Sequence, residues 1–134
     1  MGIMEFDSKP IGEVRAFIEK NYRGGTIIDY GCGCGRYTDM FPKDKYLGVD
    51  GHKGNIENCK KKYPGYKFEL HDLETWKPKQ YDCLFSSVVF DQIENLPKDW
   101  AKHYILIENE KYKEIFKPQI DEPLGTEGTR MMIC

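Results

Sequence analysis

The sequence lacks any long apolar run, since none of its stretches approaches the roughly 20 apolar residues that a membrane-spanning helix needs. The N-terminus also lacks the pattern of a signal peptide, so we expect a cytoplasmic protein without a membrane anchor. An excess of charge is lacking as well. The formal net charge of −2 gives no overall reason to expect a polyanionic partner. Without repeats or low-complexity tracts, the length predicts one domain over residues 1–134.

Cysteine is scarce and irregularly spaced. The five cysteines are Cys32, Cys34, Cys59, Cys83 and Cys134. An odd number in a chain without an export signal favours reduced thiols over a disulfide framework. Cys32 and Cys34 stand closer together than zinc ligands usually do, and no second ligand pair follows them. We therefore predict no metal site.

What the sequence does have is a glycine-rich stretch directly after a short apolar segment. Ile27 and Ile28 are β-branched and predict a buried strand, which Asp29 follows. Three glycines come next at alternate positions: Gly31, Gly33 and Gly35. Glycines this close together indicate a backbone with positive φ, or one that a ligand approaches closely. This order is typical of a nucleotide-type site at the carboxyl end of a parallel strand.

The rest of the pattern predicts strands that alternate with helices. Apolar residues recur at helical spacing over 11–22, where Ser8 and Pro10 are expected to begin a helix after a loose lead-in over 1–9. Further strands are predicted at 46–50, 67–70, 81–90 and 103–107, helices or turns at 37–41, 55–63, 96–102 and 111–116, a loop at 121–128, and an edge strand at 129–134. Alternation on short connections predicts an α/β fold with a doubly wound, mainly parallel sheet. Because the tail is short, we expect the sheet to be truncated after the fifth strand, with one extra edge strand.

Three acids stand at the ends of successive predicted strands, at Asp29, Asp50 and Asp72. A carboxylate about 20 residues beyond a glycine turn can accept hydrogen bonds from both hydroxyls of a ribose. The acid after the third strand could accept one from the amine of an adenine. These charges would repel a phosphate-rich ligand. The glycine motif of nicotinamide and flavin sites needs a glycine where Arg36 stands, so the pattern favours an adenosine-shaped pocket over a dinucleotide site.

These motifs resemble those of the Rossmann-like, class I S-adenosylmethionine-dependent methyltransferases. Residues 29–35 resemble the acid-x-Gly-x-Gly-x-Gly motif, 47–50 the second motif, 71–73 the adenine-side motif and 81–87 the fourth-strand motif. The resemblance keeps its order over roughly residues 11–107. It implies S-adenosyl-L-methionine as the cofactor, and transfer of the methyl group to an O or N atom of an acceptor.

The resemblance also implies a role for each matching residue. Asp29 would lie near the methionine amino group, and Asp50 would hold the ribose. Asp72 and the backbone of Leu73 would contact the adenine edge. The other residues implied at the cofactor site are Gly31, Cys32, Gly33, Gly35, Gly51, His52, Ser86 and Ser87.

The methyl acceptor stays open. The sequence motifs of DNA amino methylases and of cytosine-carbon methylases are absent after the fourth strand. Asp91 and Gln92 lie where an acceptor should approach, so they are candidate catalytic residues, with Asp91 as a general base or an orienting carboxylate. A structural cap is the alternative for Asp91. We expect a small-molecule acceptor. RNA or protein is an alternative, although the lysines at 60–62 are typical of a solvated helix face.

Two further hypotheses concern activity and assembly. The chain could be a non-catalytic S-adenosylmethionine-binding protein or the regulatory partner of another subunit. A homodimer or a partner subunit could also cover the short edge of the sheet, where apolar side chains would otherwise be exposed. The residues that motivate this second hypothesis are Ile105, Ile107, Met131, Met132 and Ile133.

Overall fold

The computed structural model of the chain describes residues 3–125 and 128–134, with side chains from residue 10 onward. The strands are β1 (Ile27–Tyr30), β2 (Tyr46–Asp50), β3 (Lys67–Leu70), β4 (Tyr81–Ser87), β5 (Ala101–Asn109), β6 (Ile120–Leu124) and β7 (Thr129–Ile133). The helices are α1 (Ile3–Asn21), α2 (Lys53–Lys62) and α3 (Lys113–Phe116). The short 3-10 helices in the described ranges are η1 (Thr38–Met40), η2 (Lys43–Lys45), η3 (Phe90–Gln92) and η4 (Glu110–Tyr112). Among the described residues, no helix is long and apolar enough to cross a membrane.

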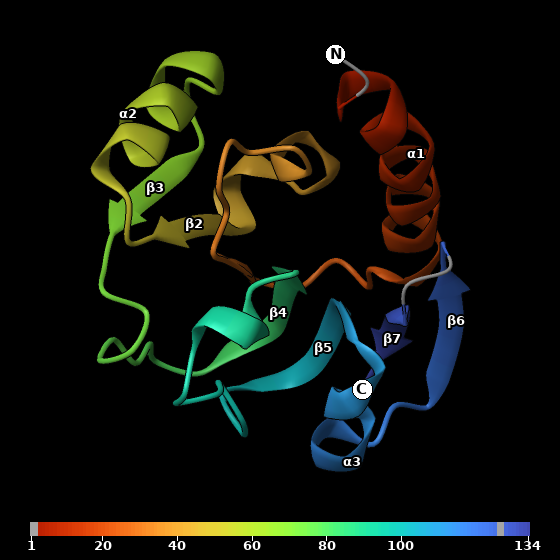
Figure 1. Cartoon of the computed structure of the whole chain (residues 1–134). Coiled ribbons are helices and arrows are strands. Elements are labelled where there is room, and N and C mark those ends of the chain that lie inside the picture. Colours follow the sequence, from red (N-terminus) through yellow and green to blue (C-terminus); the bar gives the residue numbers. More distant parts are fainter. Residues whose placement is uncertain (1–2, 126–127) are drawn as a thin grey trace.

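The strands form one sheet in the order β3-β2-β1-β4-β5-β7-β6 (Figure 1). Strands β1 to β5 are parallel, and β7 runs antiparallel to both β5 and β6. The mainly parallel α/β sheet predicted from the sequence is confirmed. Because β1 lies between β2 and β4, the strand order reverses at the carboxyl end of β1, which is where open α/β sheets bind ligands.

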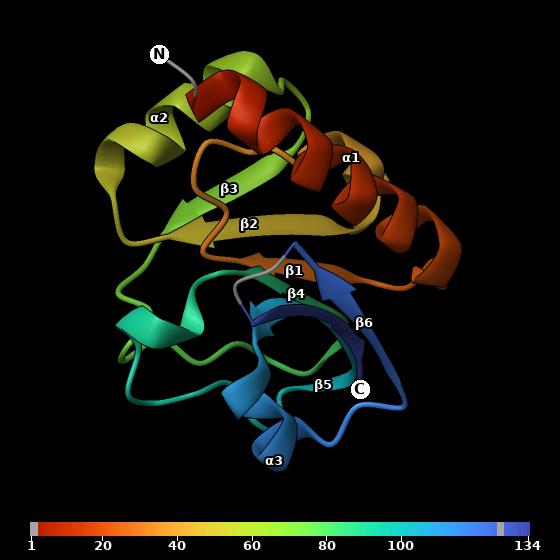
Figure 2. The ribbon, with the colours of Figure 1, turned by 45° about the vertical axis from the view of Figure 1, so that its right-hand side comes forward.

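Each face of the sheet has its own hydrophobic core. Figure 2 shows α1 and α2 on one side of the sheet and α3 on the other. Along β4, Cys83 and Phe85 pack into the core beneath α1, whereas Leu84 packs into the opposite core. Alternate side chains of this central strand are therefore buried on both faces, as expected for a parallel sheet.

The face that carries α3 is covered mostly by loops. In the described residues 71–80 and 88–100, no α-helix joins β3 to β4 or β4 to β5, and aromatic rings pack against one another in these connections. Trp76 stacks on His71 with a centroid distance of 4.7 Å, and Trp100 packs edge-on against Trp76 at 6.4 Å and Tyr30 at 5.8 Å. These contacts fix the loops that flank the carboxyl ends of the strands.

Several predicted boundaries were wrong. Helix α1 already begins at Ile3, so most of the predicted lead-in is helical, and residues 1–2 lie outside the described residues. Pro10 lies inside this helix. Because proline cannot donate a backbone hydrogen bond, the sequence predicted that the helix begins at Pro10 rather than before it. Strand β4 ends at Ser87 rather than at residue 90, because Val88 has a positive φ of 56°. The helix or turn predicted over 96–102 is a turn at residues 98–99, and β5 begins at Ala101 rather than at residue 103.

The C-terminal tail also differs from its prediction. Residues 121–124 of the predicted loop belong to β6, and this strand rather than β7 is the outer edge. Asp121 and Pro123 gave this strand the composition of a loop, although charges and proline are typical of edge strands. Because β6 covers β7, the apolar residues 131–133 that suggested a homodimer or partner are buried within the chain. Residues 126–127 of the predicted loop lie outside the described residues.

Candidate functional site

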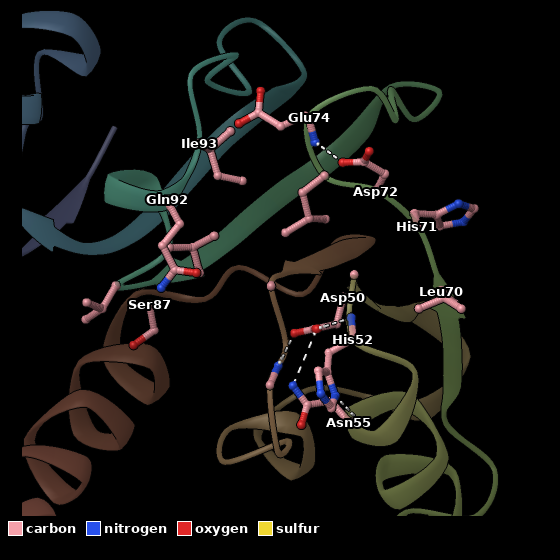
Figure 3. Close-up of a pocket in the computed structure, with 16 residues that line it drawn as sticks. Asp50, His52, Asn55, Leu70, His71, Asp72, Glu74, Ser87, Gln92 and Ile93 are labelled. Carbon is pink, nitrogen blue, oxygen red and sulfur yellow. Dashed lines mark hydrogen bonds between the residues drawn. The ribbon is translucent and has the colours of Figure 1, made fainter.

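A cavity of about 780 Å³ lies at the carboxyl ends of the parallel strands, where the strand order reverses (Figure 3). Its size falls within the range of roughly 300–1,000 Å³ that is usual for small-molecule sites. Most of the predicted site residues line it, namely Gly31, Gly33, Asp50, Gly51, His52, Asp72, Leu73, Ser87 and Gln92. The structure therefore brings together motifs that are dispersed over the sequence.

Other lining residues were missed. They are Asn55, Leu70, His71, Glu74, Val88, Val89 and Ile93. His71 lies inside the predicted motif 71–73, and most of the others lie directly beside a predicted motif or site residue, so that position was the signal that could have identified them. Asn55 lies in the first turn of α2 and had no such signal. Among the described residues, no three or more His, Cys, Asp or Glu side chains are grouped to hold a metal ion.

Two glycines of the turn after β1 face different surroundings. Gly31 has a φ of +75°, and a Cβ there would meet the side chain of Val89 at 2.6 Å. Gly33 has a φ of +55°, and nothing lies within 4 Å of the place that its Cβ would take. Because Gly33 lines the cavity, a ligand can approach its backbone where a side chain would intrude.

Asp50 is held by the segments that surround the cavity. Its Oδ2 accepts a hydrogen bond of 2.9 Å from the backbone N–H of Gly33, and its Oδ1 accepts one of 2.8 Å from the N–H of His52. The side chain of Asn55 donates a longer bond of 3.4 Å to Oδ1. A carboxylate has about four lone-pair sites, so this arrangement fixes Asp50 and leaves some of its capacity to accept hydrogen bonds.

The loop after β3 forms the opposite wall of the cavity. The Oδ1 atom of Asp72 accepts a 2.9 Å bond from the N–H of Glu74, which closes a tight turn. The hydroxyl of Tyr30 donates a 2.9 Å bond to the carbonyl of Leu73. This loop is therefore tied to β1, in the middle of the sheet.

Asp29 does not line the cavity. It is 4% exposed and accepts a 2.6 Å hydrogen bond from the hydroxyl of Tyr46. Burial raises the pKa of Asp29 to about 7, against the opposing effect of the Tyr46 bond, and the charge of Asp50 raises it further. Contact of this carboxylate with a methionine amino group remains a prediction. Cys32, Gly35 and Ser86 also lie outside the cavity lining.

The turn after β4 forms the wall where an acceptor was expected. Val88 has a φ of +56° and is 58% exposed, and it lines the cavity with Ser87 and Val89. Behind it lies Glu108, which is only 2% exposed. Its carboxylate accepts hydrogen bonds from the Ser86 hydroxyl and from the N–H groups of Val89 at 2.9 Å and Phe90 at 3.2 Å. Burial raises the pKa of Glu108, and these three donors oppose that rise.

The two candidate catalytic residues separate in the structure. Gln92 lines the cavity, whereas Asp91 does not. The carboxylate of Asp91 accepts a 2.6 Å hydrogen bond from Tyr112 and lies 2.8 Å from the ammonium of Lys111. Lys111 and Tyr112 hold its pKa below the usual range for an aspartate. A strongly paired carboxylate outside the cavity is poorly placed as a general base, and the catalytic role of Asp91 stays a prediction.

Comparison with known proteins identifies relatives of this chain. Residues 28–104, more than half of the chain, match the family described as "Methyltransferase domain". The trans-aconitate 2-methyltransferase of Sinorhizobium fredii is 33% identical over 89 residues, covering 63% of this chain and 32% of that protein. The enzyme of the same name from Variovorax paradoxus is 33% identical over 73 residues, covering 50% of this chain and 28% of that protein. The chain thus spans about a third of the length of these curated relatives.

Solved structures share the fold. The TehB-like SAM-dependent methyltransferase from Corynebacterium glutamicum superposes with a TM-score of 0.66 at 16% identity, over 91% of this chain and 85% of that chain. Coclaurine N-methyltransferase, solved with N-methylheliamine and SAH, superposes with a TM-score of 0.62 at 16% identity, over 76% of this chain and 36% of that chain. With the strand order and the matched residues, these findings show that the chain belongs to the methyltransferase domain family, among the Rossmann-like, class I S-adenosylmethionine-dependent methyltransferases.

Proposed function

We propose that the chain binds S-adenosyl-L-methionine in this cavity and transfers its methyl group to an O or N atom of a small-molecule acceptor. The observation that carries the proposal is the position of Asp50 and Asp72 on two sides of one cavity, with the open backbone of Gly33 beside Asp50. Asp50 would accept hydrogen bonds from the ribose hydroxyls, and Asp72 with Leu73 would contact the adenine.

The charges of the cavity support this cofactor. Among the described residues, the lining contains the carboxylates of Asp50, Asp72 and Glu74 and no lysine or arginine. Such a surface repels a ligand with phosphates, but it tolerates the positively charged sulfonium and the amino group of S-adenosylmethionine. In this orientation Gly51 and His52, which line the cavity, would lie against the adenine, and Ser87, which also lines it, would lie near the methionine.

The proposed reaction is an in-line displacement. A lone pair on the acceptor O or N attacks the methyl carbon, the bond from carbon to sulfur breaks, and the sulfur keeps that electron pair. The acceptor proton leaves to water or to a base. Alignment and exclusion of water can supply much of the rate when the acceptor is already nucleophilic. Gln92, which lines the cavity, would orient the acceptor through its amide.

The acceptor side of the cavity favours an uncharged group near the reacting atom. Ser87, Val88, Val89, Gln92 and Ile93 line this side, and none of them carries a charge. The relatives are named for trans-aconitate, a carboxylate, which would need a cationic partner in a site of this kind. We therefore propose a small-molecule acceptor whose reacting end is neutral.

Calorimetry tests the cofactor part of this proposal. Wild-type protein should bind both S-adenosylmethionine and its demethylated product, S-adenosylhomocysteine, and Asp50→Ala should bind each of them much more weakly. Failure of the wild type to bind either compound would contradict the proposed function. Turnover can then be measured with a panel of neutral metabolites, carboxylates and RNA.

A second candidate function is binding of the cofactor without catalysis, as a regulatory partner of another subunit. Two observations favour it: Asp91 is paired with Lys111 outside the cavity, and none of the described residues Ser87, Val88, Val89, Gln92 and Ile93 on the acceptor side is an acid or a base. Binding of S-adenosylmethionine without turnover on any member of the panel would favour this second function.

A further inference from the structure

The cavity wall between Val88 and Asn95 is held at both ends by carboxylates from other segments of the chain. At its first end, Glu108 of β5 accepts the backbone N–H groups of Val89 and Phe90. At its second end, Glu74 binds the backbone in the same manner, from the loop after β3. The residues between these two contacts, which include Gln92 and Ile93, are therefore anchored at both ends by hydrogen bonds to other segments.

The contact at Glu74 is reciprocal. Its Oε1 accepts a 2.7 Å hydrogen bond from the N–H of Glu94, and its Oε2 accepts a 3.3 Å bond from the N–H of Asn95. In return, the side-chain amide of Asn95 donates a 3.1 Å bond to the carbonyl of Glu74. Hydrogen bonds to a charged acceptor are among the stronger ones in proteins, and two of these three bonds end at the charged carboxylate of Glu74.

Glu74 is also part of the wall where the adenine is proposed to bind. It lines the cavity itself, and Figure 3 shows it beside Ile93, with its N–H bonded to Asp72. One residue therefore joins two walls: its backbone belongs to the turn of Asp72 and Leu73, and its carboxylate holds the far end of the acceptor wall. A ligand that fixes Asp72 also fixes the residue that positions Glu94 and Asn95.

We propose that Glu74 is a positioning residue that couples the cofactor site to the acceptor site. Adenine bound at Asp72 and Leu73 further stabilises the turn that carries Glu74, and Glu74 transmits this stabilisation to residues 93–95 and the acceptor wall. The inference rests on the proposed function. It predicts that the acceptor binds better once the cofactor is bound, because cofactor binding further stabilises the wall that receives the acceptor.

Amide hydrogen exchange, measured by NMR on ¹⁵N-labelled protein, tests the coupling directly. In the wild type, saturating S-adenosylhomocysteine should slow the exchange of the Glu94 and Asn95 amides by about tenfold, the scale of a typical coupling between two sites. In Glu74→Ala the same ligand should leave these two amides unprotected. Glu74→Gln keeps one acceptor oxygen and should give an intermediate protection.

Glu94→Gln is the matched control. It removes a negative charge from the same connection while leaving the backbone N–H that Glu74 accepts, so ligand-dependent protection should match the wild type. If Glu74 has only a structural role, Glu74→Ala should raise the amide exchange rates equally with and without S-adenosylhomocysteine. This outcome would overturn the coupling. If Glu74→Ala does not fold, the comparison of Glu74→Gln with Glu94→Gln decides in the same way.

The outcomes also separate this inference from the proposed function. Wild-type protein that does not bind S-adenosylhomocysteine would overturn both. Binding of the ligand with unchanged exchange at Glu94 and Asn95 would overturn the coupling alone. Equal protection in wild type and Glu74→Ala would likewise overturn it, while the proposed cofactor site would stand.

Discussion

The hydroxyl of Tyr46 donates a 2.6 Å hydrogen bond to the buried carboxylate of Asp29, across the neighbouring strands β2 and β1. The Tyr46 oxygen also lies 2.9 Å from the hydroxyl oxygen of Thr38, so the carboxylate belongs to a buried polar cluster of three side chains. Because burial raises the pKa of Asp29 to about 7, the protonation of this cluster changes near neutral pH.

We expect stability to fall as the pH rises toward neutrality, and Asp29 to be one cause. Its pKa is 3.8 in the unfolded chain and about 7 in the folded one, so the folded state binds the proton more tightly. The stabilisation is complete below pH 4 and is lost as the pH rises through 7, by at most about 4 kcal/mol. In urea unfolding, the free energy of unfolding should decrease less between pH 5 and pH 8 for Asp29→Asn than for the wild type. An equal decrease in both proteins would contradict the role of Asp29 in this pH dependence.

Asp50→Ala should weaken the binding of S-adenosylhomocysteine by about 30-fold or more, since about 2 kcal/mol is expected for the loss of bonds to a charged acceptor. Isothermal calorimetry provides the measurement. Asp44→Ala is the control, because Asp44 is an exposed acid of the 3-10 helix η2 and does not line the cavity. Similar affinities of Asp50→Ala and Asp44→Ala would refute the ribose contact.

Alanine at Gly31 and at Gly33 should have different consequences. Both positions have positive φ, so each substitution costs about 1 kcal/mol of backbone strain. Gly31→Ala also drives a Cβ into Val89 and should lower the unfolding temperature further. Gly33→Ala should instead reduce affinity for S-adenosylhomocysteine, because its Cβ would enter the cavity. Thermal unfolding and calorimetry on both variants decide this, and equal effects on both measurements would contradict it.

Glu108→Ala should destabilise the fold by about 3 kcal/mol, because it leaves a buried hydroxyl and two backbone N–H groups without their acceptor. Ser86→Ala removes only one of these donors and should cost about 1 kcal/mol. Denaturant unfolding of the two variants gives both free energies. A loss for Glu108→Ala no larger than that for Ser86→Ala would show that the backbone bonds contribute little.

Gln92 and Asp91 should differ in turnover once an acceptor is known. Gln92→Ala should lower kcat by about tenfold, or 1.4 kcal/mol of barrier, with unchanged binding of S-adenosylhomocysteine. Asp91→Ala should leave turnover nearly unchanged, because its carboxylate is paired with Lys111 and Tyr112 outside the cavity. A tenfold loss in Asp91→Ala would instead support the catalytic role predicted from the sequence.

Local signals were sufficient for the central part of the molecule. Strands β2 and β3 have the bounds that the sequence predicted, since each is a short segment with an apolar face between clear turn residues. Asp50 and Asp72 could be assigned to one site because parallel strands bring their carboxyl ends to the same edge of a sheet. These features depend on neighbouring residues and on the handedness of the connections, and both can be read from a sequence.

Other features depend on contacts that no local pattern shows. Strand β6 looked like a loop because Asp121 is polar, yet its carboxylate bonds to Arg130 of β7 at 2.7 Å and to Lys113 of α3 at 2.8 Å. Asp91 was predicted to be catalytic because it follows β4, but its carboxylate is bonded to Tyr112 and Lys111 outside the cavity. Such long-range pairs are formed only in the folded chain.

The aromatic packing beside the cavity has an optical consequence. The chain contains two tryptophans, and their rings lie in edge-to-face contact within the loops that flank the site. Trp76 is stacked on His71, which lines the cavity. Intrinsic fluorescence excited at the indole band therefore arises from this one region. The emission of the unmodified protein should report ligand occupancy without an attached dye.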